Sequence, residues 1–66
     1  MNDKKYVVYY NGKKHKYYYI DSFWFDINNL FDINSQYVKP ILYSDDFELT
    51  KKVTRGLNAR LQEQGY

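Results

Sequence analysis

The residue types that carry catalysis or bind transition metals are scarce in this chain. It holds a single histidine, His15, and no cysteine, which excludes any site built from two imidazoles or from thiolates. No serine stands where the sequence would pair it with His15 as a nucleophile with its base. We interpret His15 as a surface residue that contacts a partner or a phosphate group, and the sequence predicts no enzyme.

Three aspartates, Asp21, Asp26 and Asp32, are the next candidates for chemistry, as paired carboxylates or as metal ligands. Their spacing is irregular, and the segment lacks the glycine and the glutamate of a calcium-binding loop. Turn formation and helix capping account better for aspartates in such positions. We therefore expect no bound metal and no cofactor.

The most distinctive feature is a run of tyrosines and lysines near the N-terminus. Nine of the 66 residues are tyrosine, and six of these lie between Tyr6 and Tyr19, interleaved with lysines. A chain of this size cannot bury so many large rings with polar tips, so some must lie at the surface, where tyrosine beside lysine makes an effective contact patch. The predicted partner-binding patch comprises Tyr10, Lys13, Lys14, His15, Lys16, Tyr17 and Tyr19.

Three explanations of this patch stay open. Tyrosine rings stack on nucleic-acid bases while lysines meet phosphates, so the patch could bind nucleic acid. Tyrosine is also enriched in protein–protein interfaces, whose rims are polar. The third explanation is structural, because tyrosine has a high β-propensity and forms stabilising pairs across neighbouring strands.

The net charge of +2 hides a division of the chain into three segments. Residues 1–20 carry a net charge of +4, residues 21–48 a net charge of −5 and residues 49–66 a net charge of +3. Either the folded surface is polarised, or these segments neutralise one another across the fold. A secondary basic face of Lys51, Lys52 and Arg55 either follows a phosphate backbone or is simply solvated.

A β-hairpin is expected to position the patch. Asn11-Gly12 between two aromatic runs is the strongest short-range hairpin signal in the chain. A tight turn at this dipeptide pairs Tyr10 with Lys13, whereas a longer loop over residues 11–16 pairs Tyr10 with Tyr17. The two registers differ by an even number of residues, so they assign the same side chains to each face.

The two faces of this hairpin differ in their aliphatic content. One face holds Tyr6, Val8, Tyr10, Tyr17 and Tyr19, and the other holds Val7, Tyr9, Tyr18 and Ile20. We expect Val7 and Ile20 to point inward. The three tyrosines of the patch would then point outward.

The middle of the chain contains an aromatic anchor and a third strand. Of the three rings in Phe23-Trp24-Phe25, we expect at least two in the core. Asp26 is expected to cap a short helix or an ordered loop over residues 27–31. The stretch from Tyr37 to Tyr43 predicts a strand, and Pro40 makes it an edge strand or a bulged one.

The last element is a helix. Asp45 as N-cap with Glu48 at the third helical position predicts a capping box and a helix from Asp46 to Gln64, with Gly65 as its C-terminal cap. Close packing over Gly56 would explain a glycine inside this helix, where it costs about 1 kcal/mol. The predicted apolar face of the helix comprises Phe47, Thr50, Val53, Leu57 and Leu61.

These elements predict one domain over residues 1–66 in the α+β class. We expect a three-stranded antiparallel sheet, made of the N-terminal hairpin and a third strand, with one long C-terminal helix packed on one face. The other face would meet water, a foreign partner or a second copy of the chain, which would make a homodimer.

The expected location of the chain is the cytoplasm of a bacterial host cell. No apolar stretch approaches the roughly 20 residues that a membrane span needs. The first residues carry lysines but no apolar run of the length found in secretory signals. We therefore expect no membrane partner.

By composition and size the chain resembles the accessory proteins of phages and mobile elements from low-GC bacteria. Lysine, asparagine, tyrosine, isoleucine and phenylalanine, which have A/T-rich codons, make up 31 of the 66 residues. The group includes anti-CRISPR proteins and other inhibitors of host machinery. The resemblance implies a non-enzymatic inhibitor or modulator that occupies a surface of a host protein or nucleoprotein complex, and this is our leading hypothesis.

A second resemblance concerns the expected architecture. Three antiparallel strands followed by a helix is similar to the arm-site DNA-binding domain of tyrosine-recombinase integrases from conjugative transposons, and the stretch KYYYIDSF over residues 16–23 resembles a strand of that family. The sheet of that family enters the major groove, so the alternative function is a DNA- or RNA-binding sheet domain. This chain lacks the arginine-rich sheet face that the family would lead us to expect.

Overall fold

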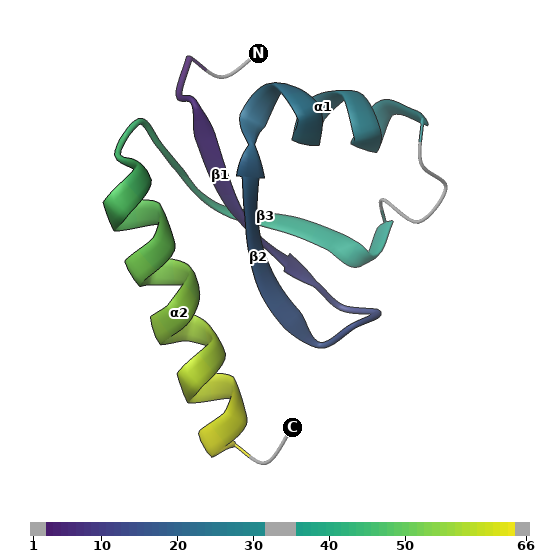
Figure 1. The fold of residues 1–66 in the computed structure, drawn as a ribbon. Helices are drawn as coiled ribbons and strands as arrows, with labels where there is room; N and C mark the ends of the chain where they lie inside the picture. The colour runs from purple at the N-terminus through teal and green to yellow at the C-terminus, as the bar shows by residue number, and fades with distance from the viewer. Residues whose placement is uncertain (1–2, 32–35, 65–66) are drawn as a thin grey trace.

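Three strands and two helices make up the fold in a computed structural model, which describes residues 3–31 and 36–64. The elements are β1 (Tyr6–Asn11), β2 (Lys16–Asp21), α1 (Ser22–Phe31), β3 (Val38–Ser44) and α2 (Phe47–Glu63). The strands form one antiparallel sheet in the order β2-β1-β3 (Figure 1). The predicted α+β fold, with a three-stranded antiparallel sheet and a C-terminal helix, is confirmed.

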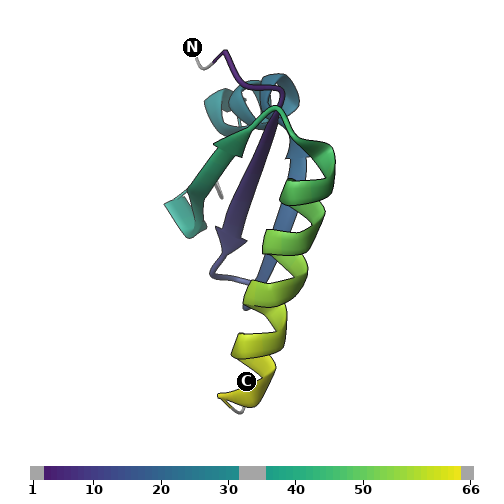
Figure 2. The ribbon, with the colours of Figure 1, turned by 90° about the vertical axis from the view of Figure 1, so that its left-hand side faces the viewer.

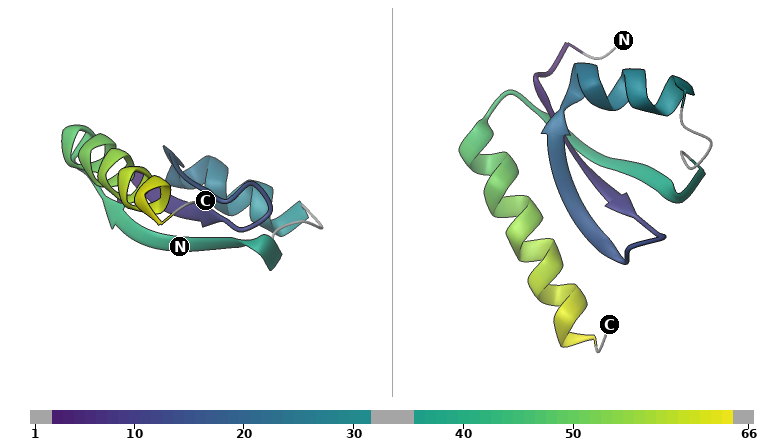
Figure 3. Two further views of the ribbon diagram at one scale, coloured as in Figure 1. Left: turned by 90° about the horizontal axis from the view of Figure 1, so that it is seen from below. Right: turned by 45° about the vertical axis from the view of Figure 1, so that its right-hand side comes forward.

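The two helices lie on opposite faces of the sheet. Figure 2 shows α2 in front of the sheet and alongside β2, while α1 lies behind it, and Figure 3 shows the same arrangement from below. Ring contacts agree with this layering, because Phe47 of α2 meets Tyr6 and Tyr19, whereas Phe25 of α1 meets Tyr9. We call these sides the α2 face and the α1 face of the sheet.

This layering corrects the expected orientation of the hairpin. The tyrosine-rich face is the one that α2 covers, and the face with Val7 and Ile20 carries α1. The expectation that the patch tyrosines Tyr10, Tyr17 and Tyr19 point away from the core helix is therefore wrong. The prediction went wrong because it allowed only one covering helix, whereas Val7 and Val8, on opposite faces of the central strand, are both fully buried.

The hairpin uses the longer of the two open registers. Tyr10 pairs with Tyr17 and Asn11 pairs with Lys16, so a four-residue loop joins the strands. The Asn11 side chain stabilises this loop by accepting hydrogen bonds from the N–H groups of Lys13 and Lys14, at 3.0 and 3.1 Å. The backbone of Gly12 approaches the chain before β3, where its N–H donates to the Tyr37 carbonyl at 2.8 Å.

The third strand is both an edge strand and a bulged strand, as Pro40 predicted. Val8 pairs with Leu42 and Tyr9 pairs with Pro40, so Ile41 is an extra residue opposite the central strand. Proline cannot donate to a ladder, which confines it to such positions. The strand begins at Val38 and ends at Ser44, one residue later at each end than predicted.

The first helix begins five residues earlier than expected. Asp21, not Asp26, caps it, because its carboxylate accepts hydrogen bonds from the N–H groups of Phe23 at 2.9 Å and Trp24 at 3.4 Å. Ser22 fixes the start of the helix to the segment before β1. Its N–H donates to the Lys5 carbonyl at 2.8 Å, and its hydroxyl donates to the Lys4 carbonyl.

Only one ring of the aromatic anchor enters the core. Phe25 is 6% exposed, whereas Phe23 and Trp24 are 55% and 57% exposed. The expectation of two buried rings is therefore wrong. Successive residues of a helix point about 100° apart, so three consecutive rings cannot all face one sheet.

The second helix ends within one residue of the prediction, but its cap differs. Asp46, not Asp45, is the N-cap, and its carboxylate accepts the N–H of Leu49 at 3.1 Å. Asp45 is instead used by the segment before β1, where it accepts the Lys5 N–H at 2.9 Å and lies 3.6 Å from the Lys4 ammonium group. The predicted cap at Gly65 lies outside the described residues.

The buried side of α2 is more polar than predicted. Thr50 is fully buried and Thr54 is 7% exposed, while Phe47 is 42% exposed. Each threonine hydroxyl donates to the carbonyl four residues earlier, at 2.8 and 2.9 Å, so its burial leaves no unsatisfied polar atom. The expected packing over Gly56 is wrong, because a Cβ built there meets nothing within 4 Å.

Candidate partner-binding surfaces

The structure divides the predicted patch between the two faces of the sheet. Tyr10, Tyr17 and Tyr19 lie on the α2 face. Lys14 and Lys16 reach the α1 face, where their ammonium groups lie 5.9 and 5.6 Å from the centre of the Tyr18 ring. The hairpin loop connects the two groups, and Lys13, Lys14, His15 and Lys16 are all exposed there.

On the α2 face, the tyrosines of the hairpin form a ladder of ring contacts. The rings of Tyr10 and Tyr17 lie 4.9 Å apart as a cross-strand pair, and the Tyr10 hydroxyl lies 3.2 Å from Nδ1 of His15. Tyr19, which is 40% exposed, meets Phe47 edge-on at 5.8 Å. These tyrosines therefore have structural as well as contact roles.

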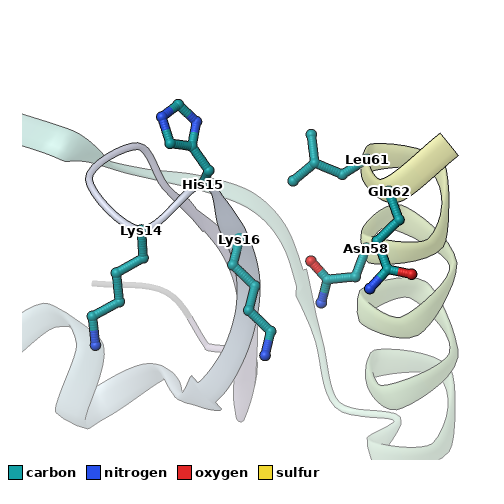
Figure 4. Close-up of a pocket in the computed structure, with 6 residues that line it drawn as sticks. All are labelled: Lys14, His15, Lys16, Asn58, Leu61 and Gln62. Carbon is teal, nitrogen blue, oxygen red and sulfur yellow. The ribbon is translucent and has the colours of Figure 1, made fainter. Parts of the chain in front are cut away.

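A cleft opens where the hairpin loop approaches the C-terminal half of α2 (Figure 4). It has a volume of about 190 Å³. In Figure 4 the side chains of Leu61, Asn58 and Gln62 project from the helix toward the loop. The residues that line this hairpin–helix cleft are Lys14, His15, Lys16, Asn58, Leu61 and Gln62.

Asn58 holds the two walls of this cleft together, and sequence reasoning missed it. Its side-chain oxygen accepts the N–H of Tyr17 at 2.8 Å, and its side-chain nitrogen donates to the Tyr17 carbonyl at 3.0 Å. Asn58 thus makes with the outer edge of β2 the pair of bonds that another strand would make. An asparagine among the apolar positions of a helix was the only signal in the sequence that could have pointed to this role.

The predicted secondary basic face on α2 is only partly free for a partner. The Lys51 ammonium group lies 3.4 Å from the Glu48 carboxylate and 5.0 Å from the centre of the Phe47 ring. Lys52 and Arg55 are exposed on the same helix. Of the three cations, one is therefore committed to contacts within the helix.

The α1 face carries stacked tyrosines next to exposed rings. Tyr9 and Tyr18 stack at 5.7 Å, and Phe25 covers Tyr9 at 5.1 Å. Phe23 and Trp24 form an edge-to-face pair at 6.0 Å on α1 and are both more than half exposed. Sequence reasoning expected at least two of the three rings of Phe23-Trp24-Phe25 in the core and did not consider these rings as contact residues.

Two tyrosines have perturbed ionisation. Burial raises the pKa of Tyr9, and the neighbouring Tyr18 adds to this effect. Burial also raises the pKa of Tyr43, with a further contribution from the negative charge of Asp26. Both phenols are therefore held neutral by the fold well into the alkaline range.

Neither a metal-binding cluster nor a membrane-spanning helix occurs in the described part of the chain. In residues 3–31 and 36–64, no three His, Asp or Glu side chains come together as a metal site would require. Asp32, one of the three aspartates considered from the sequence, lies outside those ranges. Within the same part of the chain, neither helix has the length and apolar character needed to cross a bilayer.

Comparisons with protein-family models, with curated proteins and with solved structures gave no match to this chain.

Proposed function

We propose that this protein is a non-enzymatic binding protein that inhibits or modulates a larger protein or nucleoprotein complex of a bacterial cell. It would do so as anti-CRISPR and related accessory proteins do, by covering a surface of its target. The contact would be made by the hairpin loop and by the hairpin–helix cleft. This function needs buried anchors and charge complementarity but no chemical step.

The observation that carries this proposal is the composition of the hairpin–helix cleft. Three residues of the hairpin, Lys14, His15 and Lys16, line the cleft together with the apolar side chain of Leu61 and the amide of Gln62. A concave site with an apolar wall and a few polar groups is typical of sites that bind a protruding side chain or a short segment. The excess of positive charge favours a partner that presents an acidic group there.

The lysines of the loop are well placed for such a contact. The two ion pairs found among residues 3–31 and 36–64 join Lys4 to Asp45 and Lys51 to Glu48, so neither uses a lysine of the loop. Their charge would therefore attract an acidic partner and accelerate its association.

Affinity capture from a lysate of a low-GC bacterium, with and without nuclease, tests this proposal. We expect a stoichiometric protein partner that survives nuclease treatment. Gln62→Glu, which adds a negative charge to the cleft, should weaken its capture at least about 10-fold, since each factor of ten corresponds to about 1.4 kcal/mol. Ala59→Glu adds the same charge at an exposed position of α2 outside the cleft, and it should leave capture unchanged. Equal effects of both substitutions would contradict the assignment of the cleft.

A nucleic-acid-binding function is the second candidate, and one observation favours it. Two exposed lysines, Lys14 and Lys16, hold their ammonium groups 5.9 and 5.6 Å from the centre of the Tyr18 ring, and a ring beside positive charges suits an unpaired base and its phosphates. Binding of a single-stranded oligonucleotide should then weaken steeply and log-linearly with salt concentration. Tyr18→Leu should lower the affinity without changing the salt dependence, because it removes the ring and keeps both lysines. Absence of binding at low salt would remove this candidate.

A further inference from the structure

We propose that the α1 face binds a second copy of this chain, in a two-fold symmetric dimer in which α1 of each copy packs against the hairpin end of its partner's sheet. The proposal goes beyond the function proposed above, which assigns the foreign partner to the hairpin–helix cleft, although Lys14 and Lys16 belong to both surfaces. In such a dimer the same surface is used by both copies, so each contact occurs twice.

Several large apolar side chains are exposed and would gain burial from another molecule. Among the side chains that the structure describes, those of residues 3–28 and 36–64, the buried apolar ones are Val7, Val8 and Phe25. Chains of this size are marginally stable and commonly gain the missing burial from disulfides, metals or oligomerisation. This chain has no cysteine. Large apolar side chains that stay at least 40% exposed are Tyr19, Phe23, Trp24, Tyr37, Ile41, Phe47 and Leu49.

The first helix has an apolar side that points away from its own sheet. Phe25 faces the sheet, where it meets Tyr9. Phe23 and Ile27 are each two residues from Phe25, and two residues correspond to a rotation of about 200° around a helix. These side chains therefore lie on the opposite side of α1. A helix with apolar residues on two opposite sides is typical of a helix buried between two layers.

The hairpin end of the α1 face offers the matching surface. The Phe25 ring covers Tyr9, but the ring of Tyr18 beside it is covered by exposed lysines of its own hairpin. The α1 helix starts at the opposite end of β2, directly after Asp21. A two-fold rotation that reverses the strand direction would place the outer side of the partner's α1 against Tyr18 and the lysines beside it.

Charge complementarity favours this antiparallel arrangement. The helical end of the α1 face carries Asp26, whose charge acts on Tyr43, and the hairpin end carries Lys14 and Lys16. The two-fold rotation brings the acidic end of each copy next to the basic end of the other, whereas a parallel arrangement would place like charges together. The basic and acidic segments of the sequence would thus attract each other across the interface between two copies.

The two edges of the sheet are poorly suited to bind a second copy of the chain. Asn58 occupies the backbone groups of Tyr17 on the outer edge of β2. Pro40 and the bulge at Ile41 interrupt the outer edge of β3. Both devices are typical of edges that resist pairing with another strand, so a contact between faces is favoured over strand addition.

Sedimentation equilibrium or light scattering of the full chain, measured over a range of concentrations, tests the proposal. We expect the mass of a dimer at high concentration and dissociation on dilution. Trp24 is the only tryptophan and lies on α1, so its fluorescence emission should shift to longer wavelength as the dimer dissociates. A monomer mass at all concentrations up to about 1 mM, the range of very weak contacts, would overturn the proposal.

Matched substitutions locate the interface. Phe23→Asp should raise the dissociation constant of the dimer at least about 30-fold, the effect of losing a central aromatic anchor. Leu49→Asp removes an equally accessible apolar side chain from α2, on the other side of the sheet, and should leave the dissociation constant within about 3-fold of the wild-type value. A dimer that is insensitive to Phe23→Asp, or that is dissociated by Leu49→Asp alone, would refute this interface.

A charge reversal tests the antiparallel geometry. The variant with Lys14→Glu and Lys16→Glu has two acidic ends, and the variant Asp26→Lys places a positive charge on α1. Each variant alone should dimerise more weakly than the wild type, while an equimolar mixture should form a heterodimer, since both reciprocal contacts then join opposite charges. A mixture that associates no better than its components would exclude this orientation.

Discussion

The two faces of the sheet are covered in different ways. On the α2 face, polar groups fix the geometry, because Asn58 bonds to the Tyr17 backbone and the hydroxyl of the buried Thr50 bonds within its helix. On the α1 face, Ser22 bonds the start of α1 to the Lys4 and Lys5 carbonyls, and farther along the helix the buried ring of Phe25 packs on Tyr9. An attachment made by directional bonds is specified by its own chain. An attachment made by apolar packing is less directional, and another molecule can complete it.

The difference also separates two kinds of exposed apolar residue. On the α2 face, Phe47 is partly exposed but contacts Tyr6, Tyr19 and Lys51, so it belongs to the fold. On α1, Phe23 has Trp24 as its ring partner, and both rings are more than half exposed. Exposure in the first case reflects incomplete burial, and in the second case it marks a contact surface.

The largest expected effect comes from comparing two phenylalanines of α1. Phe25→Ala should lower the free energy of unfolding by about 3 kcal/mol, because it deletes the ring that joins α1 to the sheet. Phe23→Ala should change it by no more than about 0.5 kcal/mol in dilute solution, where the chain is monomeric. Chemical denaturation at low protein concentration measures both values. Similar losses for the two variants would mean that both rings stabilise the monomer.

The next effect concerns the polar attachment of α2. Asn58→Ala should lower the free energy of unfolding by about 2 kcal/mol, since it removes two hydrogen bonds and leaves the Tyr17 N–H and carbonyl without their partner. Asn58→Asp keeps the acceptor and loses the donor. The free energy of unfolding should fall by a comparable amount, because the new carboxylate is held close to the Tyr17 carbonyl and repels it. Hydrogen exchange of the Tyr17 amide should accelerate in the alanine variant. An unchanged exchange rate there would show that Asn58 does not protect this edge.

A smaller effect of opposite sign is expected at Gly56. Alanine at this position should stabilise the protein by about 1 kcal/mol, because nothing lies within 4 Å of the added methyl group. Thermal unfolding of Gly56→Ala measures the gain in stability. Ala59→Gly, on the same exposed part of α2, should lower the stability by a similar amount. A destabilising Gly56→Ala would show that another molecule packs closely over this turn.

The smallest effect is a loss of stability in alkali that originates on the α1 face. Tyr9 and Tyr43 have pKa values raised above the ordinary value of 10.0, so above that pH the unfolded chain loses protons that the folded chain still holds. The free energy of unfolding should therefore fall as the pH rises from about 10 through the raised pKa values. Denaturation curves at a series of pH values measure this slope, and Tyr9→Phe should reduce it. A slope that is the same in the wild type and in Tyr9→Phe would contradict the role of this phenol.

Much of the architecture could be read from local patterns. The Asn11-Gly12 signal, the position of Pro40 and the apolar periodicity of α2 each depend on residues within one element, and each led to an element that the structure contains. Local signals fail where two candidates stand side by side. Asp45 and Asp46 are equally good caps in sequence, and the choice depends on Lys4 and Lys5, which lie 40 residues away.

The surfaces were less predictable than the fold. The tyrosines and lysines of the patch alternate along a hairpin, and alternation sends neighbours to opposite faces, so residues that are close in sequence were separated in space. Asn58 was missed because its partner is the backbone of Tyr17, and a backbone group leaves no trace in the sequence. At least two of the rings of Phe23, Trp24 and Phe25 were expected in the core because composition alone does not show which side of a helix meets the sheet.

The bond pair between Asn58 and Tyr17 has a consequence for the colloidal behaviour of the protein. The second strand contains KYYYI, a short aromatic and β-branched segment of the kind that stacks into cross-β fibrils once its edge is accessible. The side-chain amide of Asn58 occupies that edge at Tyr17, the first tyrosine of the run. Fibril formation by this chain is therefore governed by the local detachment of α2, and a solution of the protein should become prone to fibrils well before its sheet unfolds.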